Sequence, residues 1–137
     1  MPKVRGVLET SLYVEDLARA VDFYKSVFEF ETLVKDERMC ALNISNHQVL
    51  LLFHKGASDK FMPVSGGVIP PHDGAGHLHV AFAISADDLE LWEQHLRAKQ
   101  IHIESRVVWS RGGTSLYIRD PDNHLIELAT PGLWEIY

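Results

Sequence analysis

Three ionisable residues stand inside apolar, strand-like stretches of this 137-residue chain. They are Glu9 in V-L-E-T-S-L-Y-V, His79 in H-L-H-V-A-F-A-I and Glu127 in L-I-E-L-A. A carboxylate among apolar neighbours needs a partner, and two carboxylates brought together repel each other. A divalent cation between them offsets that repulsion, and carboxylate with imidazole suits Fe, Mn, Co, Ni or Zn. The residue types therefore indicate a metal site, with a solvated sheet face as the alternative.

Alternation along the strands predicts which side chains share a face. The apolar positions around His79 are expected to pack on helices, so His77 and His79 point the other way. The same rule puts Glu9, Tyr13 and Glu127 on the face away from the helices. The helix-side positions of the first strand are then Leu8, Leu12 and Val14.

Further polar residues fall on the same faces or in the adjoining loop. We expect Tyr117 to orient or protonate a substrate oxygen, and Arg119 to pair with an anionic substrate or with Glu127. Sheet packing with solvated tips is the alternative for both side chains. His54 and His72 are expected to be surface histidines, with contact to the metal or a proton relay as the alternative.

The elements that must position these residues form one pattern stated twice. In the first half, the pattern predicts a strand at 7–14, a helix capped by Asp16 and strands at 38–44 and 48–53. In the second half, it predicts a strand at 79–84, a helix capped by Asp87 or Asp88, and strands at 101–109, 114–119 and 125–129. An Asn-His pair precedes the last strand of each half. The interpretation is an α+β fold with a duplicated β-α-β-β-β unit and helices on one face of the sheet.

The chain is expected to form one domain over residues 1–137. Module one spans about 6–54, a connecting loop about 55–76, module two about 77–130 and a tail 131–137. The loop contains five glycines and three prolines. A loop of that length in a compact domain is typical of a linker, a lid or a binding loop.

Composition excludes several classes of protein. The net charge is −6 and no long basic run appears, which argues against nucleic-acid binding. No apolar run approaches the roughly 20 residues of a membrane helix, and no signal peptide is apparent at the start. The single cysteine, Cys40, is expected in the core of a protein from a reducing, cytoplasmic compartment.

Three stretches together resemble the vicinal oxygen chelate superfamily, which includes glyoxalase I, bleomycin-resistance and fosfomycin-resistance proteins and extradiol dioxygenases. The stretches are L-Y-V-E-D-L-A-R-A-V-D-F-Y, G-H-L-H-V-A-F-A-I and S-L-Y-I-R-D-P-D-N-H-L-I-E-L-A. The resemblance implies two tandem β-α-β-β-β modules that curl a mixed sheet around a central cavity. It also implies a homodimer, and a metal on the inner face of the sheet that binds neighbouring oxygens of a small substrate.

Carried over by position, the resemblance implies Glu9, His79 and Glu127 as the metal ligands. Many catalytic relatives have histidine where Glu9 stands, and a Glu-His-Glu set favours Mn, Ni or Zn over an iron dioxygenase centre. The resemblance to glyoxalase I implies four metal ligands, of which the fourth is a carboxylate at the end of the first module. Aligning the two Asn-His pairs puts Leu50 opposite Glu127, and leucine cannot be the fourth ligand, so true glyoxalase I activity is not expected.

The prediction is a metal-dependent enzyme of the lyase, isomerase or dioxygenase type that acts on a small oxygenated substrate. Two alternatives remain. The first is a metal-free protein that binds and sequesters a small molecule, as bleomycin-resistance proteins do, in a groove lined by Phe53, Phe61, Trp109 and Trp134. The second is a structural or partner-binding domain, because a fold does not fix a function.

Overall fold

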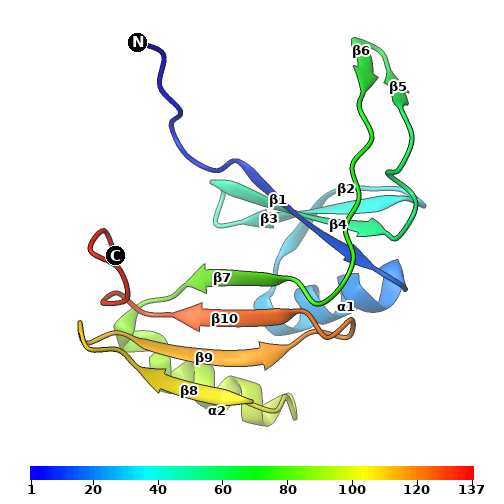
Figure 1. Ribbon diagram of the computed structural model, residues 1–137. Helices are drawn as coiled ribbons and strands as arrows, with labels where there is room; N and C mark the ends of the chain where they lie inside the picture. The colour runs from blue at the N-terminus through cyan, green and yellow to red at the C-terminus, as the bar shows by residue number, and fades with distance from the viewer. The chain divides into compact units, whose positions relative to one another are not determined.

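The computed structural model describes all 137 residues, which form two compact units, Met1–Ala75 and Gly76–Tyr137. Each unit contains a four-stranded mixed sheet and one α-helix (Figure 1). The segment expected as a connecting loop belongs almost entirely to the first unit.

The first unit contains β1 (Glu9–Val14), α1 (Leu17–Phe28), β2 (Glu31–Lys35), β3 (Met39–Ile44) and β4 (Gln48–His54). The strand order is β1-β4-β3-β2. The β1–β4 pair is parallel, and the other two pairs are antiparallel. Helix α1 packs on β3 and β4.

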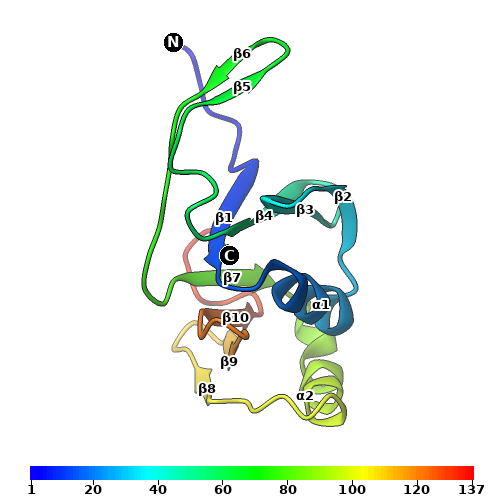
Figure 2. The same cartoon turned by 90° about the vertical axis from the view of Figure 1, so that its right-hand side faces the viewer.

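The second unit contains β7 (His79–Ala83), a 3₁₀ turn (Ala86–Asp88), α2 (Leu89–Ala98), β8 (Ser105–Val108), β9 (Thr114–Arg119) and β10 (Leu125–Ala129). The strand order is β7-β10-β9-β8, again with a parallel pair formed by the first and last strands. Helix α2 lies along one face of this sheet (Figure 2). The two units therefore share one topology, which confirms the predicted pair of β-α-β-β-β modules.

Helix α1 begins where the sequence predicts. The Asp16 side chain accepts a hydrogen bond from the Arg19 backbone N–H at 3.0 Å, and this caps the first turn. The helix ends at Glu29, whose φ of 58° is left-handed. One stripe is buried against the sheet, formed by Leu17, Ala20, Val21, Tyr24 and Val27.

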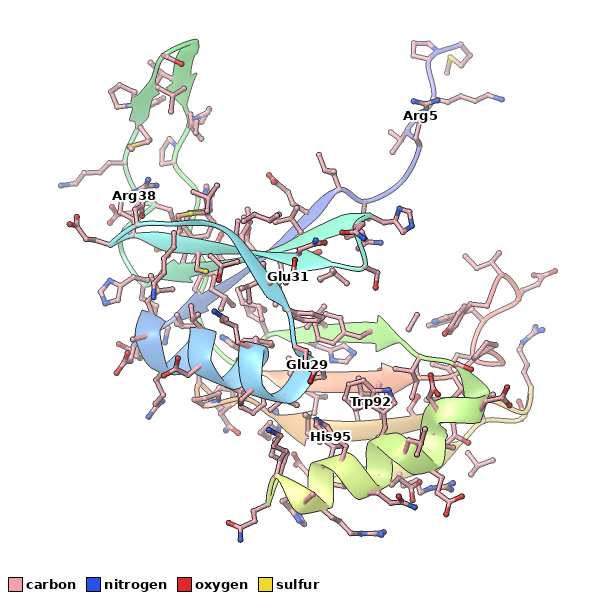
Figure 3. The ribbon with its side chains drawn as sticks, turned by 180° about the vertical axis from the view of Figure 1, so that it is seen from behind. Arg5, Glu29, Glu31, Arg38, Trp92 and His95 are labelled. Atoms are coloured by element: carbon pink, nitrogen blue, oxygen red, sulfur yellow. The ribbon has the colours of Figure 1, made fainter.

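The cap of the second helix differs from the prediction. Neither Asp87 nor Asp88 caps it with a side chain, because a 3₁₀ turn precedes α2. Ser85 has an extended backbone, and its hydroxyl accepts from the Asp87 N–H at 3.2 Å. Trp92 and His95 project from α2 toward the sheet with their rings at 87° to one another (Figure 3). Leu96 of the same helix is fully buried.

Strand register corrects one alignment made from the sequence. Glu9 pairs with Val49 in the first unit, and His79 pairs with Leu125 in the second. The residue equivalent to Glu127 is therefore Leu51, and Leu50 was the wrong position. In the first unit Gln48 separates His47 from the aligned position Val49, whereas in the second unit Leu125 directly follows His124, so the two Asn-His pairs are offset by one residue.

The core follows the predicted alternation with one exception. Leu12 and Val14 are buried, but Leu8 precedes β1 and is 68% exposed. Cys40 is a free, fully buried thiol, as expected for a core residue, and burial is the main cause that raises its pKa. Neither α-helix has the length and apolar character to cross a membrane.

Two elements were not recognised from the sequence. The first is β2, an exposed strand at the edge of the first sheet, where no face is buried and no alternation arises. The second is a hairpin of β5 (Met62–Val64) and β6 (Gly67–Ile69) inside the expected loop. In the tail, Trp134 is 69% exposed, and the Tyr137 hydroxyl donates to the Ala129 carbonyl oxygen, 2.9 Å away.

Candidate metal centre

His79 and Glu127 lie on one face of two neighbouring parallel strands. His79 begins β7 opposite Leu125 of β10, and Glu127 lies two residues further along β10, so both side chains point to the same side. The His79 Nε2 and Glu127 Oε1 atoms are 3.3 Å apart. The structure therefore brings together two of the three predicted metal ligands.

The second nitrogen of the imidazole has a fixed partner. His79 Nδ1 lies 2.9 Å from the Leu125 carbonyl oxygen. A carbonyl only accepts, so Nδ1 carries the hydrogen and, in the neutral ring, Nε2 carries a lone pair directed at Glu127. A hydrogen bond from the other ring nitrogen to a backbone carbonyl is typical of histidines that bind metals through Nε2.

Glu127 is buried among hydrogen-bond donors. Its side chain is 7% exposed. The Ser115 hydroxyl donates to Glu127 Oε2 at 2.5 Å, and Trp109 Nε1 donates to the Ser115 hydroxyl oxygen at 2.8 Å. We refer to these three residues as the Trp109–Ser115–Glu127 chain. It occupies one carboxylate oxygen and leaves the other facing His79.

Tyr117 is directly opposite Glu127 in the antiparallel β9–β10 pair. Its ring is tilted against the His79 imidazole, with 6.4 Å between the ring centroids. Burial is the largest cause that raises the pKa of the Tyr117 phenol, and the negative charge of Glu127 raises it further. A hydrogen bond with Glu127 also raises this pKa, so the phenol is protonated at neutral pH.

Arg119 pairs with Glu104 and not with Glu127. Its Nε lies 2.7 Å from Glu104 Oε2, and its Nη1 donates to the Asn123 carbonyl at 3.1 Å. The hydrogen bond from Arg119 lowers the pKa of the Glu104 carboxyl. Glu104 was not singled out from the sequence, where it lies inside the strand expected at 101–109; in the structure it directly precedes β8.

The remaining candidates are exposed or lie in the other unit. Glu9 is exposed and begins β1, in the first unit. His77 precedes β7 and is exposed, as is His54 at the end of β4. No three His, Cys, Asp or Glu side chains are grouped closely enough in the structure to form a metal cluster. The described centre is thus a pair of ligands.

The chemistry of this pair fits a metal ion. A lone pair on Nε2 and a carboxylate oxygen repel each other, so a proton or a cation must lie between them. Donors that bind one metal at about 2.0–2.2 Å in neighbouring positions lie about 3.0–3.5 Å apart. The observed 3.3 Å between Nε2 and Oε1 falls in that range.

Comparison with known proteins identifies the family. The sequence model of the Glyoxalase/Bleomycin resistance protein/Dioxygenase superfamily matches residues 6–128. The chain belongs to this superfamily. Its duplicated module and strand order are the fold of that superfamily, as the sequence resemblance implied.

Members of the superfamily with similar sequences are enzymes. Metallothiol transferase FosB of Bacillus licheniformis is 28% identical over 134 residues, which cover 97% of this chain and 80% of that protein. The crystal structure of lactoylglutathione lyase from Agrobacterium tumefaciens has a TM-score of 0.89 and 29% identity, and covers 98% of this chain and 99% of that one. The structure of a fosfomycin resistance protein, FosX, from Listeria monocytogenes was solved in complex with Mn(II) and sulfate. It has 20% identity and a TM-score of 0.70 over 96% of this chain and 94% of that one. At this identity the similarity supports the fold alone.

Proposed function

We propose that this chain is a divalent-metal-dependent enzyme that acts on a small oxygenated substrate, with Glu9, His79 and Glu127 as the metal ligands. The observation that carries the proposal is the pair of His79 Nε2 and Glu127 Oε1 at 3.3 Å, with the imidazole hydrogen held on Nδ1 by a backbone carbonyl. A neutral imidazole and a buried carboxylate in this arrangement favour a cation between them.

Glu9 is proposed as the third ligand from its position in the repeated module. It is the first residue of β1 and pairs with Val49, as His79 is the first residue of β7 and pairs with Leu125. The two residues therefore occupy equivalent positions in the two units. A second carboxylate makes the set harder and more negative, which favours Mn, Ni or Zn over a redox iron centre.

A bound divalent cation would supply Lewis acidity toward two neighbouring oxygens of the substrate. The role we propose for Tyr117 is to donate its phenolic proton toward a substrate oxygen, because its raised pKa keeps it protonated. We propose that Arg119 contacts an anionic part of the substrate from its position at the end of β9. The metallothiol transferases among the relatives favour a thiol as one of the substrates to test.

We also propose that the chain forms a homodimer, as the superfamily resemblance implies. In the second unit, the face that carries His79 also carries Ala81 and Ala83, and all three residues are exposed. Sedimentation velocity on the purified protein is expected to give twice the mass of one chain. A single monomer peak at micromolar concentration would contradict the dimer.

Elemental analysis of the purified protein tests the metal site. The wild type is expected to hold about one equivalent of a transition metal, and His79→Ala and Glu127→Ala are expected to lose it. His77→Ala is the matched control, because His77 is an exposed histidine two residues from His79 and outside β7. Glu9→Ala tests the third ligand and is expected to weaken metal retention.

The metal-free alternative gives the opposite result. If the wild type holds no metal after incubation with Mn, Ni, Zn and Fe(II), the proposed function is wrong. A small-molecule binding protein then becomes the better interpretation. Its ligand would be sought in the apo protein by thermal shift and by quenching of tryptophan fluorescence.

A further inference from the structure

We infer that Ser115 and Trp109 are positioning residues that hold the Glu127 carboxylate in its metal-binding orientation, and that the Trp109 indole senses occupancy of the site. The inference rests on the proposed function, since it concerns the same site. It assigns roles to two residues that contact neither substrate nor metal directly.

The Trp109–Ser115–Glu127 chain has only one possible direction. An indole N–H donates and never accepts, so the Ser115 oxygen must accept from Trp109 at 2.8 Å. The single Ser115 hydrogen is then available for Glu127 Oε2, at 2.5 Å. Trp109 therefore fixes the rotor of the hydroxyl, and the hydroxyl in turn fixes the carboxylate.

This direction divides the two oxygens of Glu127 between two tasks. Oε2 is occupied by the protein, while Oε1 faces His79 Nε2 at 3.3 Å. The carboxylate is thus held by Ser115 with Oε1 directed at the imidazole. Its rotamer is already fixed before any ion arrives, which lowers the entropy cost of binding.

The first unit shows that the fold does not require polar residues at the positions of Glu127, Ser115 and Tyr117. By register, Leu51 occupies the position of Glu127, and the cross-strand partners of β10 have their counterparts in β3. Met39 stands where Ser115 stands, and Ala41 where Tyr117 stands. The same module therefore folds with apolar residues at all three positions.

Direct measurement of metal affinity separates a positioning role from a purely structural one. Isothermal titration with Mn²⁺ and with Zn²⁺ is expected to show binding to Ser115→Ala that is about 10–100-fold weaker than to the wild type. Ser115→Thr keeps the hydroxyl and is expected to restore affinity to within about threefold of the wild type. A structural role alone would lower the melting temperature of the metal-free variant without this change in affinity.

Trp109→Phe provides a second, independent variant. Trp109 is 38% exposed, so its replacement leaves the core intact and tests the inference even if Ser115→Ala does not fold. Without the indole N–H the Ser115 hydroxyl can rotate, and we expect metal affinity to fall several-fold. Trp134→Phe is the matched control, because it removes a tryptophan that is 69% exposed.

Fluorescence gives a readout that does not depend on activity. Addition of Mn²⁺ or Zn²⁺ is expected to change tryptophan emission in the wild type and in Trp134→Phe, and not in Trp109→Phe. If the wild type binds metal and Ser115→Ala and Trp109→Phe bind it equally tightly, the inference is overturned while the proposed function stands. If the wild type binds neither of these ions, and neither Ni²⁺ nor Fe²⁺, the proposed function itself has failed.

Discussion

The Tyr13 hydroxyl lies 2.7 Å from Nδ1 of His72, and this contact joins β1 to a residue 59 positions later in the chain. The His72 ring also packs edge-on against Phe53, with 4.7 Å between centroids. Its backbone is held by Ser58, since the Ser58 hydroxyl donates to the His72 carbonyl and the His72 N–H donates to the Ser58 carbonyl. His72 therefore anchors the segment after β4 to the first sheet, and its prediction as an ordinary surface histidine was wrong.

Tyr13→Phe is expected to loosen this segment. The variant removes one hydrogen bond, worth about 1 kcal/mol, and leaves the ring packing against Phe53 in place. Hydrogen exchange should become faster in residues 58–74 with little change in α1. His54→Ala, at an exposed position in β4, is the control. Unchanged exchange in 58–74 would show that the Tyr13–His72 contact does not restrain the segment.

Gly74→Ala is expected to destabilise the first unit by about 1–3 kcal/mol. A methyl group at Gly74 would overlap the Tyr13 ring, and that ring cannot move aside because His72 and Phe53 hold it. Gly66→Ala is the matched control, since a methyl group there meets nothing within 4 Å. Chemical denaturation of both variants checks the difference, and equal midpoints would contradict it.

The Arg119–Glu104 pair predicts a stability change at acid pH. The folded protein lowers the pKa of Glu104 below its ordinary value of 4.5, chiefly through the hydrogen bond from Arg119. The stabilisation is therefore present above that value and is lost as pH falls through the folded pKa. As pH is lowered from 6 to 3, the free energy of unfolding should fall more steeply in the wild type than in Arg119→Gln.

Arg97→Gln removes the same charge from an exposed position on α2 and corrects for the change in net charge. Its pH dependence is expected to follow that of the wild type. If Arg97→Gln and Arg119→Gln show the same pH dependence of the free energy of unfolding, that dependence would arise from net charge and not from the Arg119–Glu104 pair.

Lactoylglutathione lyase activity is expected to be absent. The position in the first unit that corresponds to Glu127 is occupied by Leu51, which cannot bind a metal. The resemblance to glyoxalase I implies a fourth carboxylate at the end of the first module. Formation of lactoylglutathione by the metal-loaded wild type should therefore not exceed the rate with free metal, and turnover at an enzymatic rate would contradict this prediction.

Alternation was enough to find the pair of His79 and Glu127. Both residues lie on strands with clear period-two patterns, and the parallel β7–β10 pairing brings equivalent faces together. Alternation could not predict the residues that form hydrogen bonds with this pair. Alternation puts Ser115 on the same face of β9 as Tyr117, but its hydrogen bonds to Glu127 and Trp109 depend on cross-strand register and side-chain reach, which periodicity does not specify.

The errors share one physical cause, which is that turns set register locally. One extra residue, Gln48, between His47 and the aligned position Val49 moved the true counterpart of Glu127 from Leu50 to Leu51, and this changes a buried helix-facing position into one on the opposite face. In the same way, a short 3₁₀ turn capped by Ser85 precedes the second helix and leaves it without a side-chain cap. Both events involve one to three residues and leave the hydrophobic pattern unchanged.

The parallel pairing of first and last strands has a consequence for the order of folding. In each four-stranded sheet, the strand made last, β4 or β10, lies between the strand made first and the strand made just before it (Figure 1). During synthesis β1 or β7 therefore has no neighbour in its sheet until a helix and three more strands have emerged. Such non-local pairing slows folding and leaves strand edges open to other chains, so truncation before β10 should give an aggregating product.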